Sequence, residues 1–201
     1  MDSFFLAALL AFGLYLLKMK DQRRRVVLLA TQLGQFQIEK LMETVTSGYL
    51  RALGESDGVR REQIWQLLAT TEDQLAEQFK RFSTDFAKLD EAQTRVSRIP
   101  VAVPFADQLF PQTTFDLRRA IAIHAEGLAE ACRNDAGRSH RDKAFTVSAE
   151  LFLMQHTCHW FCRSKTTASA RLLARHQTPY AQVVASVGAG TRKAYSALIG
   201  S

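Results

Sequence analysis

Cysteine, proline and glycine are all scarce in this chain. Its 201 residues include three cysteines, four prolines and ten glycines. A small and odd number of cysteines excludes a disulfide framework. So few prolines and glycines exclude a collagenous, low-complexity or disordered chain. The length suits one globular domain and is hardly enough for two.

The short catalytic motifs are missing as well. The chain has no G-x-x-x-x-G-K-[ST], no G-x-G-x-x-G, no G-x-S-x-G and no H-E-x-x-H. Outside the first 25 residues, no long basic stripe alternates with aromatic residues, as nucleic-acid-binding surfaces do. The sequence therefore assigns no catalytic residue, leaves any cofactor-binding residue unknown and predicts no nucleic-acid partner.

One long apolar run is present, FFLAALLAFGLYLL at residues 4–17. The charge-poor stretch from Met1 is 17 residues, about 25 Å of helix, at the lower end of what spans a bilayer. A cleavable signal is disfavoured because positive charge follows the run instead of preceding it. We expect a single transmembrane anchor over residues 1–20; a buried core helix and an interfacial helix are the alternatives. The anchor residues would be Phe4, Leu6, Leu9, Leu10, Phe12, Leu14, Leu16 and Leu17.

Positive charge is concentrated directly after the apolar run. Residues 18–25 hold five cations and one anion. Basic residues that flank a spanning helix stay on the cytoplasmic side and are attracted to anionic lipid. This predicts a single-pass protein of the plasma (inner) membrane with its amino terminus outside and a cytoplasmic domain over residues 26–201. The basic flank consists of Lys18, Lys20, Arg23, Arg24 and Arg25.

The rest of the chain has helical periodicity almost throughout. We expect helices over residues 26–53, 60–98, 114–132 and 139–162, with Thr113 or Thr114 capping the third. Two short helices should follow Thr178, separated by a hinge at Gly188-Ala189-Gly190. The fold class is therefore all-α: an anchor helix followed by an antiparallel bundle of about four to five helices, some of them long.

Helix 60–98 has the most regular pattern, with apolar residues every three or four positions. Such spacing suits either a long antiparallel bundle or a coiled-coil contact. We predict that it serves contacts with other proteins, including a possible homo-oligomer. The seam, our name for the central positions of this pattern, consists of Leu75, Phe79, Phe82, Phe86 and Leu89.

Residues 97–114 form an apolar loop that contains Pro100, Pro104 and Pro111. Proline cannot continue a helix, and it pushes the preceding residue toward extended conformations. Apolar loop side chains need a cover, so the loop either packs across the bundle as a strap or presents a surface to a partner.

Histidine and cysteine cluster within residues 156–162. Buried cysteines and histidines are most often core residues, and we expect no cofactor on that basis. A zinc or haem site is the alternative; it would need ligands from two helices. The candidate ligands are His124, His156, Cys158 and Cys162.

Glu150 lies in the most apolar helix and needs a partner there, for which Arg118 or Arg119 is the candidate. His124 should likewise bond Glu150 or a backbone carbonyl. Taken together, the sequence predicts a membrane-anchored helical scaffold, adaptor or assembly protein at the cytoplasmic membrane face. The alternative is a metal- or haem-binding helical bundle.

Overall fold

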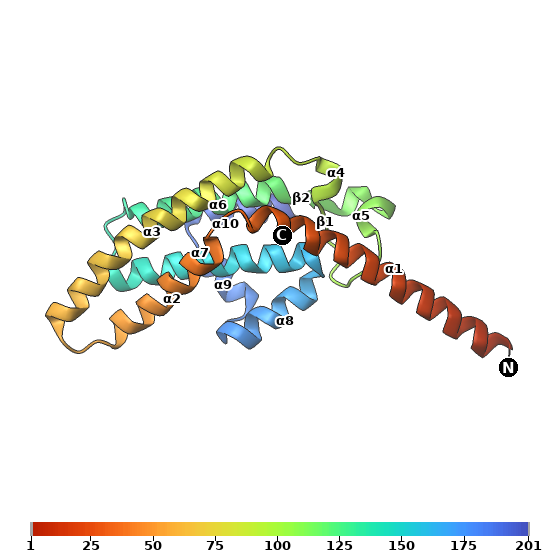
Figure 1. Cartoon of the computed structure of the whole chain (residues 1–201), viewed down its shortest axis with the longest axis horizontal. Coiled ribbons are helices and arrows are strands. Elements are labelled where there is room, and N and C mark those ends of the chain that lie inside the picture. The colour runs from red at the N-terminus through yellow and green to blue at the C-terminus, as the bar shows by residue number, and fades with distance from the viewer. Residues whose placement is uncertain (1, 201) are drawn as a thin grey trace.

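The computed structural model describes the backbone of residues 2–200 and the side chains of residues 4–200, and this part is almost entirely helical (Figure 1). The predicted all-α class is confirmed. The helices are α1 (Asp2–Leu33), α2 (Ile38–Gly54), α3 (Gly58–Phe86), α4 (Glu91–Thr94), α5 (Ala106–Leu109), α6 (Leu117–Arg133), α7 (His140–Cys162), α8 (Lys165–His176), α9 (Tyr180–Ser186) and α10 (Ala189–Ile199). A 3-10 turn, η1 (Pro111–Thr113), and two strands, β1 (Arg95–Ser97) and β2 (Thr114–Asp116), lie between α4 and α6.

Four long helices, α2, α3, α6 and α7, form the centre of the body, our name for residues 34–200. Helices α2 and α3 make one antiparallel pair and α6 and α7 another, with α3 packed on α6. Short links impose this antiparallel order, with Asp57 capping α3 and Ser139 capping α7. Helices α8 and α9 cover α7 from the other side, and α10 lies on α6. The predicted helical bundle is confirmed, but its helices outnumber the four to five expected, since the described part of the chain forms ten, several of them short.

Helix α1 does not end where the sequence suggested. It continues past the basic flank to Leu33, and the chain turns at residues 34–37 before α2. The predicted helix 26–53 is therefore two helices. The turn places Phe36 edge-on against Phe82 of α3, with the ring centroids 5.8 Å apart. This long-range contact stabilises the break between α1 and α2, whereas the local periodicity of the sequence gives no sign of the break.

The predicted helix 60–98 is also shorter than expected, because α3 ends at Phe86. After α4, β1 pairs with β2 in an antiparallel two-stranded sheet in which Val96 lies opposite Phe115. The cap of α6 is Asp116 instead of a threonine, since its carboxylate accepts the N–H of Arg118. Strands of three residues carry no alternation that a sequence pattern could reveal.

The carboxyl-terminal helices were predicted in part. The link between α9 and α10 includes Gly188, the first residue of the predicted hinge. Pro179 is the N-cap residue of α9. Helix α8 was not anticipated. It begins at the capping residue Ser164, whose hydroxyl accepts the N–H of Thr167.

The seam of α3 lies inside the body. The side chains of Leu75, Phe79, Phe82 and Phe86 are buried, and Leu89 packs against them. Helices α2 and α6 of the same chain cover α3. Covered within the chain, these side chains do not form an exposed coiled-coil face.

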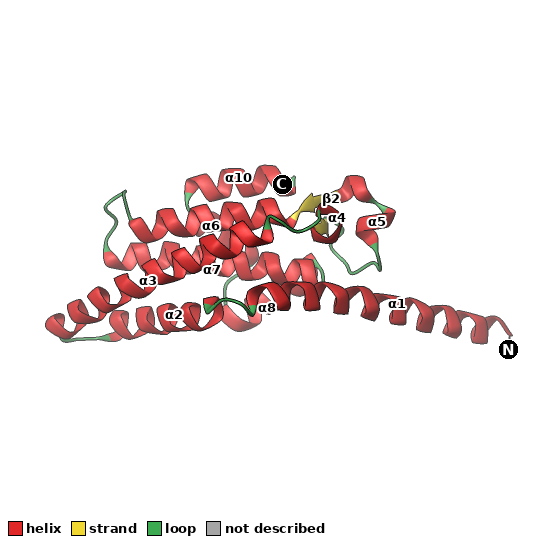
Figure 2. Cartoon of the chain, turned by 45° about the horizontal axis from the view of Figure 1, so that its top comes forward, coloured by secondary structure: helices red, strands yellow, loops and turns green. Residues whose placement is uncertain are grey.

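The amino-terminal half of α1 projects away from the body, and the link between α2 and α3 lies at the opposite end of the molecule (Figure 2). Within the described part of the chain, no helix is both long enough and apolar enough to span a membrane. The predicted transmembrane anchor is therefore not supported.

Candidate functional site

Helix α1 has two halves with opposite surroundings. Residues 4–17, the apolar half, are exposed on nearly every face, and the relative accessibility of their large apolar residues runs from 83% at Phe4 to 45% at Leu17. Residues 18–33, the docked half, bury one face against the body. A single unbroken helix thus consists of an uncovered apolar half, which we also call the rod, and a docked half that forms its base. The exposed large apolar side chains of the rod are Phe4, Phe5, Leu6, Leu9, Leu10, Phe12, Leu14, Tyr15, Leu16 and Leu17.

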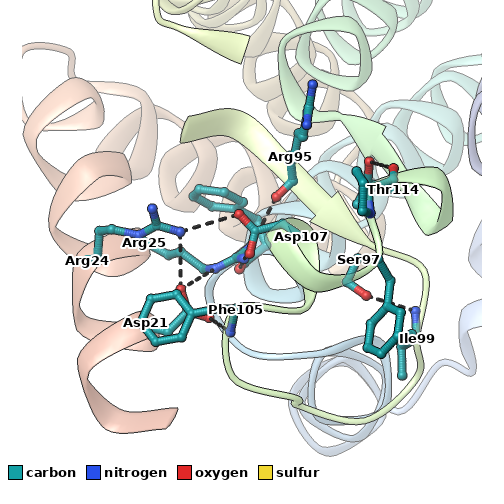
Figure 3. A network of polar contacts seen from close by, with 12 residues as sticks. Asp21, Arg24, Arg25, Arg95, Ser97, Ile99, Phe105, Asp107 and Thr114 are labelled. Carbon is teal, nitrogen blue, oxygen red and sulfur yellow. Dashed lines mark hydrogen bonds and ion pairs between the residues drawn. The ribbon is translucent and has the colours of Figure 1, made fainter. Parts of the chain in front are cut away.

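A largely buried ion-pair network fixes the docked half to the body (Figure 3). We call it the joint; it consists of Asp21, Arg24, Arg25 and Asp107. The Arg25 guanidinium donates to Asp107 Oδ1 of α5 at 2.6 Å and to Asp21 Oδ1 on its own helix at 3.3 Å. All three side chains are almost fully buried. Buried charges are stable only when they are paired and hydrogen-bonded, and here two carboxylates surround one arginine.

Arg25 also reaches the backbone of two other elements. It donates to the carbonyl of Arg95 in β1 at 3.1 Å and to the carbonyl of Phe161 in α7 at 3.4 Å. Its guanidinium carbon lies 5.3 Å from the centre of the Phe161 ring, within cation–π range. One side chain therefore holds α1, α5, β1 and α7 together.

The loop 97–114 is part of the joint. Phe105 has φ of 51°, and its N–H donates to Asp21 Oδ2 at 3.3 Å. Arg24 donates to Asp21 and to Asp107 at 3.1 and 3.4 Å. Residues 102–107 of this loop are half-buried or buried, whereas Val101 is exposed.

The structure divides the basic flank into two groups. Arg24 and Arg25 neutralise the joint, whereas Lys18, Lys20 and Arg23 are exposed and have no ion pair in the part of the chain that the structure describes. The fold also brings a cation from elsewhere in the chain to α1: Arg163, in the α7–α8 link, donates to the side chain of Gln22. Neither Asp107 nor Arg163 was predicted as a partner of α1, since they lie 82 and 141 residues along the chain from the side chains that they bond.

The four predicted metal ligands lie apart or have other partners. Over the described residues, no three His, Cys, Asp or Glu side chains come together in a metal-binding arrangement. His124 Nε2 bonds the Thr157 hydroxyl at 2.9 Å, and His156 Nε2 bonds the Ser169 hydroxyl at 3.0 Å. His124 therefore has a hydroxyl partner in place of the expected carboxylate or carbonyl.

Burial keeps these groups in their neutral forms. It lowers the pKa of both His124 and His156 to about 3, with nearby positive charge adding to the effect. It raises the pKa of Cys162 to about 11 and that of Cys158 further. Thiols held protonated in this way are poor nucleophiles and poor metal ligands.

Glu150 caps the start of α10 from inside the core. Its Oε1 accepts the N–H of Gly188 at 2.9 Å. Burial raises the Glu150 pKa to about 7, although the Gly188 N–H and the Thr191 hydroxyl partly offset the shift. The predicted arginine partner was wrong, because Arg118 pairs with Asp116 and Arg119 is exposed.

Comparisons with known proteins found no similar chain. No family model, no curated protein and no solved structure matches this sequence or its fold. The residues of the molecule therefore carry the functional argument alone.

Proposed function

We propose that this chain is a membrane-attached helical scaffold that acts through protein–protein contacts at the cytoplasmic membrane face. In this proposal the apolar half of α1 inserts into lipid and the body presents contact surfaces. The single observation that carries it is the apolar half itself, which is uncovered on nearly every side while a buried ion-pair network holds its base.

Lipid is the cover that best suits the shape and chemistry of this half. Each Leu or Phe side chain gains about 1.5–3 kcal/mol when it leaves water. The rod has no polar face, so a groove on a partner protein would have to surround it. Residues 4–17 make about 21 Å of helix, against a hydrocarbon core of about 30 Å. Insertion requires only that these residues leave water; they need not reach the opposite leaflet.

The unpaired cations support attachment to an anionic surface. Lys18, Lys20 and Arg23 follow the rod directly, at the level where lipid headgroups would begin. Each basic side chain near an anionic leaflet contributes about 1 kcal/mol. The same cations favour the cytoplasmic side for the body.

The body offers exposed apolar side chains for the protein contacts. Val101, Leu109 and Phe110 lie in the loop beside the joint, and Val59 and Leu67 lie on α3. The joint fixes the loop next to the base of the rod. A partner bound there would be held close to the membrane.

Vesicle flotation of the full-length protein tests the attachment. The purified chain is mixed in detergent with lipid, the detergent is removed, and the vesicles are floated on a density gradient. We expect the wild-type protein to float. Leu9→Asp/Leu10→Asp should stay at the bottom, because two carboxylates would enter hydrocarbon.

Leu67→Asp is the matched control, since Leu67 is similarly exposed but lies on the body. It should float like the wild type. Equal flotation of the Leu9→Asp/Leu10→Asp variant would overturn the proposed attachment.

Photocrosslinking tests the contact surface separately. A photoreactive residue in place of Leu109 should give a discrete adduct in cells, and Phe110→Asp in the same chain should remove it. The same residue placed at Arg138, an exposed position in the α6–α7 link, should give no such adduct. Adducts of equal yield at both positions would contradict a specific surface on the loop.

A further inference from the structure

The last quarter of the chain contains no acidic residue. Residues 151–201 hold six lysines and arginines and no aspartate or glutamate. Two of the six, Arg171 and Arg175, lie one turn apart on α8 and are exposed. In the described part of the chain neither of them forms an ion pair.

These arginines share a cleft of about 400 Å³ with three histidines, between α7 and α8. No carboxylate lines this cleft. Clefts of this size accept small ligands. The polar lining residues are Gln155, His156, His159, Arg171, Arg175 and His176.

Two of the histidine rings are held in place. The His156 ring stacks on Tyr180 with the ring centres 4.3 Å apart. The His176 ring stacks on Phe152 at 3.7 Å, and its Nε2 lies 3.1 Å from Gln155 Oε1. His156 Nδ1 is buried and has no hydrogen-bond partner among the described residues. The walls of the cleft are thus ordered before any ligand arrives.

The cleft carries positive charge, and no carboxylate is among the residues that line it. Burial lowers the pKa of His159, and the charges of Arg171 and Arg175 lower it further. Burial, Arg175 and His159 lower the pKa of His176 in the same way. An anion bound between these groups would offset the repulsion between the positive charges and would therefore favour the protonated histidines.

We infer that the cleft between α7 and α8 binds a phosphate-bearing anion through Arg171, Arg175 and His159. Two guanidinium groups match the charge of a phosphate dianion, and their planar donor edges suit its oxygens. Protonated His159 would supply a third donor. Phosphate is the shared chemistry, and its source would be a soluble phosphate compound or a lipid headgroup.

Histidine NMR of the full-length protein in detergent micelles tests this inference. We would follow the ring resonances of His159 and His176 through a pH titration in inorganic phosphate. The reference is sodium chloride at the same ionic strength. We expect phosphate to raise both apparent pKa values by about one unit, which corresponds to about tenfold tighter binding to the protonated ring.

Variants separate binding from general screening. Arg171→Gln/Arg175→Gln should abolish the phosphate effect, whereas Arg192→Gln/Lys193→Gln on α10 should retain it. Phosphatidic acid added to the same micelles identifies the source: competition at low inorganic phosphate indicates a headgroup, and no competition indicates a soluble anion. Equal pKa values in phosphate and chloride would overturn the site.

Discussion

The apolar half of α1 and the part of α7 after its first turn share an apolar pattern and have opposite surroundings. Both are apolar on nearly every side. Leu151 and Leu153 of α7 are fully buried, whereas Leu10 of α1 is 61% exposed. Helices α2, α6, α8 and α9 cover α7, and no element of the described chain covers residues 4–17. An apolar pattern therefore states that a helix needs a cover, but not whether the chain itself supplies it.

The joint is where the two situations meet. Arg25 of α1 bonds the carbonyl of Phe161 near the end of α7. The covered helix thus helps to hold the base of the uncovered one. The body therefore fixes the direction of the rod through its base and leaves the rod itself uncovered.

The same substitution in the two helices should give the largest contrast. Leu153→Asp would place a carboxylate in a closely packed core, and we expect loss of about 5 kcal/mol or more, so that the body fails to fold. Leu10→Asp should change the free energy of unfolding of the body by less than about 0.5 kcal/mol. Circular dichroism during thermal unfolding measures both. Similar losses in both variants would mean that the rod packs on the body.

Breaking the joint should have the next largest effect. Arg25→Met leaves the buried Asp21 and Asp107 with only the partly exposed Arg24 as a cation. We expect a loss of about 3–5 kcal/mol that appears as undocking of α1. Hydrogen exchange of the amides at residues 18–33 should then accelerate.

Arg24→Met is the control for this experiment, because the Arg24 side chain is 41% exposed. It should cost less than about 1 kcal/mol. If the two variants exchange at the same rate, Arg25 is not the residue that holds the joint.

The cover over α7 should also impose a pH dependence that the rod lacks. Because the pKa of Glu150 rises from 4.5 to about 7 on folding, the folded state binds its proton more tightly than the unfolded state. The free energy of unfolding from this group therefore falls as the pH rises from about 4.5 to 7 and is constant above that. Glu150→Gln removes the ionisation.

Urea unfolding at several pH values measures this effect. The variant should gain stability relative to the wild type as the pH rises, by up to about 3 kcal/mol at pH 7.5. His124 and His156 titrate in both proteins, so their contribution cancels in the difference. Glu126→Gln, at an exposed position, should show no such trend. A pH-independent difference for Glu150→Gln would refute the buried titration.

Two glycines give the smallest contrast. A Cβ at Gly127 of α6 would lie 2.8 Å from Glu150 Oε2 and would also meet Thr191, so Gly127→Ala should cost about 2 kcal/mol. At Gly13 of the rod nothing lies within 4 Å of the added atom. Gly13→Ala should leave the stability of the body unchanged within about 0.5 kcal/mol. Urea unfolding of both variants checks this, and a loss at Gly13 would reveal a hidden contact of the rod.

Much of the fold was predictable where the deciding interactions are local. Helices α6 and α7 lie close to the predicted helices 114–132 and 139–162. Helical spacing and capping residues act within one or two turns of chain, so a sequence displays them.

The candidate site was predictable only in part, for the opposite reason. Arg25 and Asp107 lie 82 residues apart, and no local pattern links them. The strand pair after α4 and the break before α2 likewise depend on partners far along the chain. The hydrogen-bond partners of His124 and His156 are the hydroxyls of Thr157 and Ser169, which no ligand pattern includes.

The sequence by itself determined that this chain is helical, that it carries an uninterrupted apolar run over residues 4–17 and that five cations follow this run. These are properties of composition and spacing. The tertiary structure alone decided which apolar helix is covered and which cations are free. Arg24 and Arg25 are held in the joint while Lys18, Lys20 and Arg23 face outward. The physical reason is that burial and ion pairing depend on which distant segments of the chain pack against a residue, and only the tertiary structure determines those contacts.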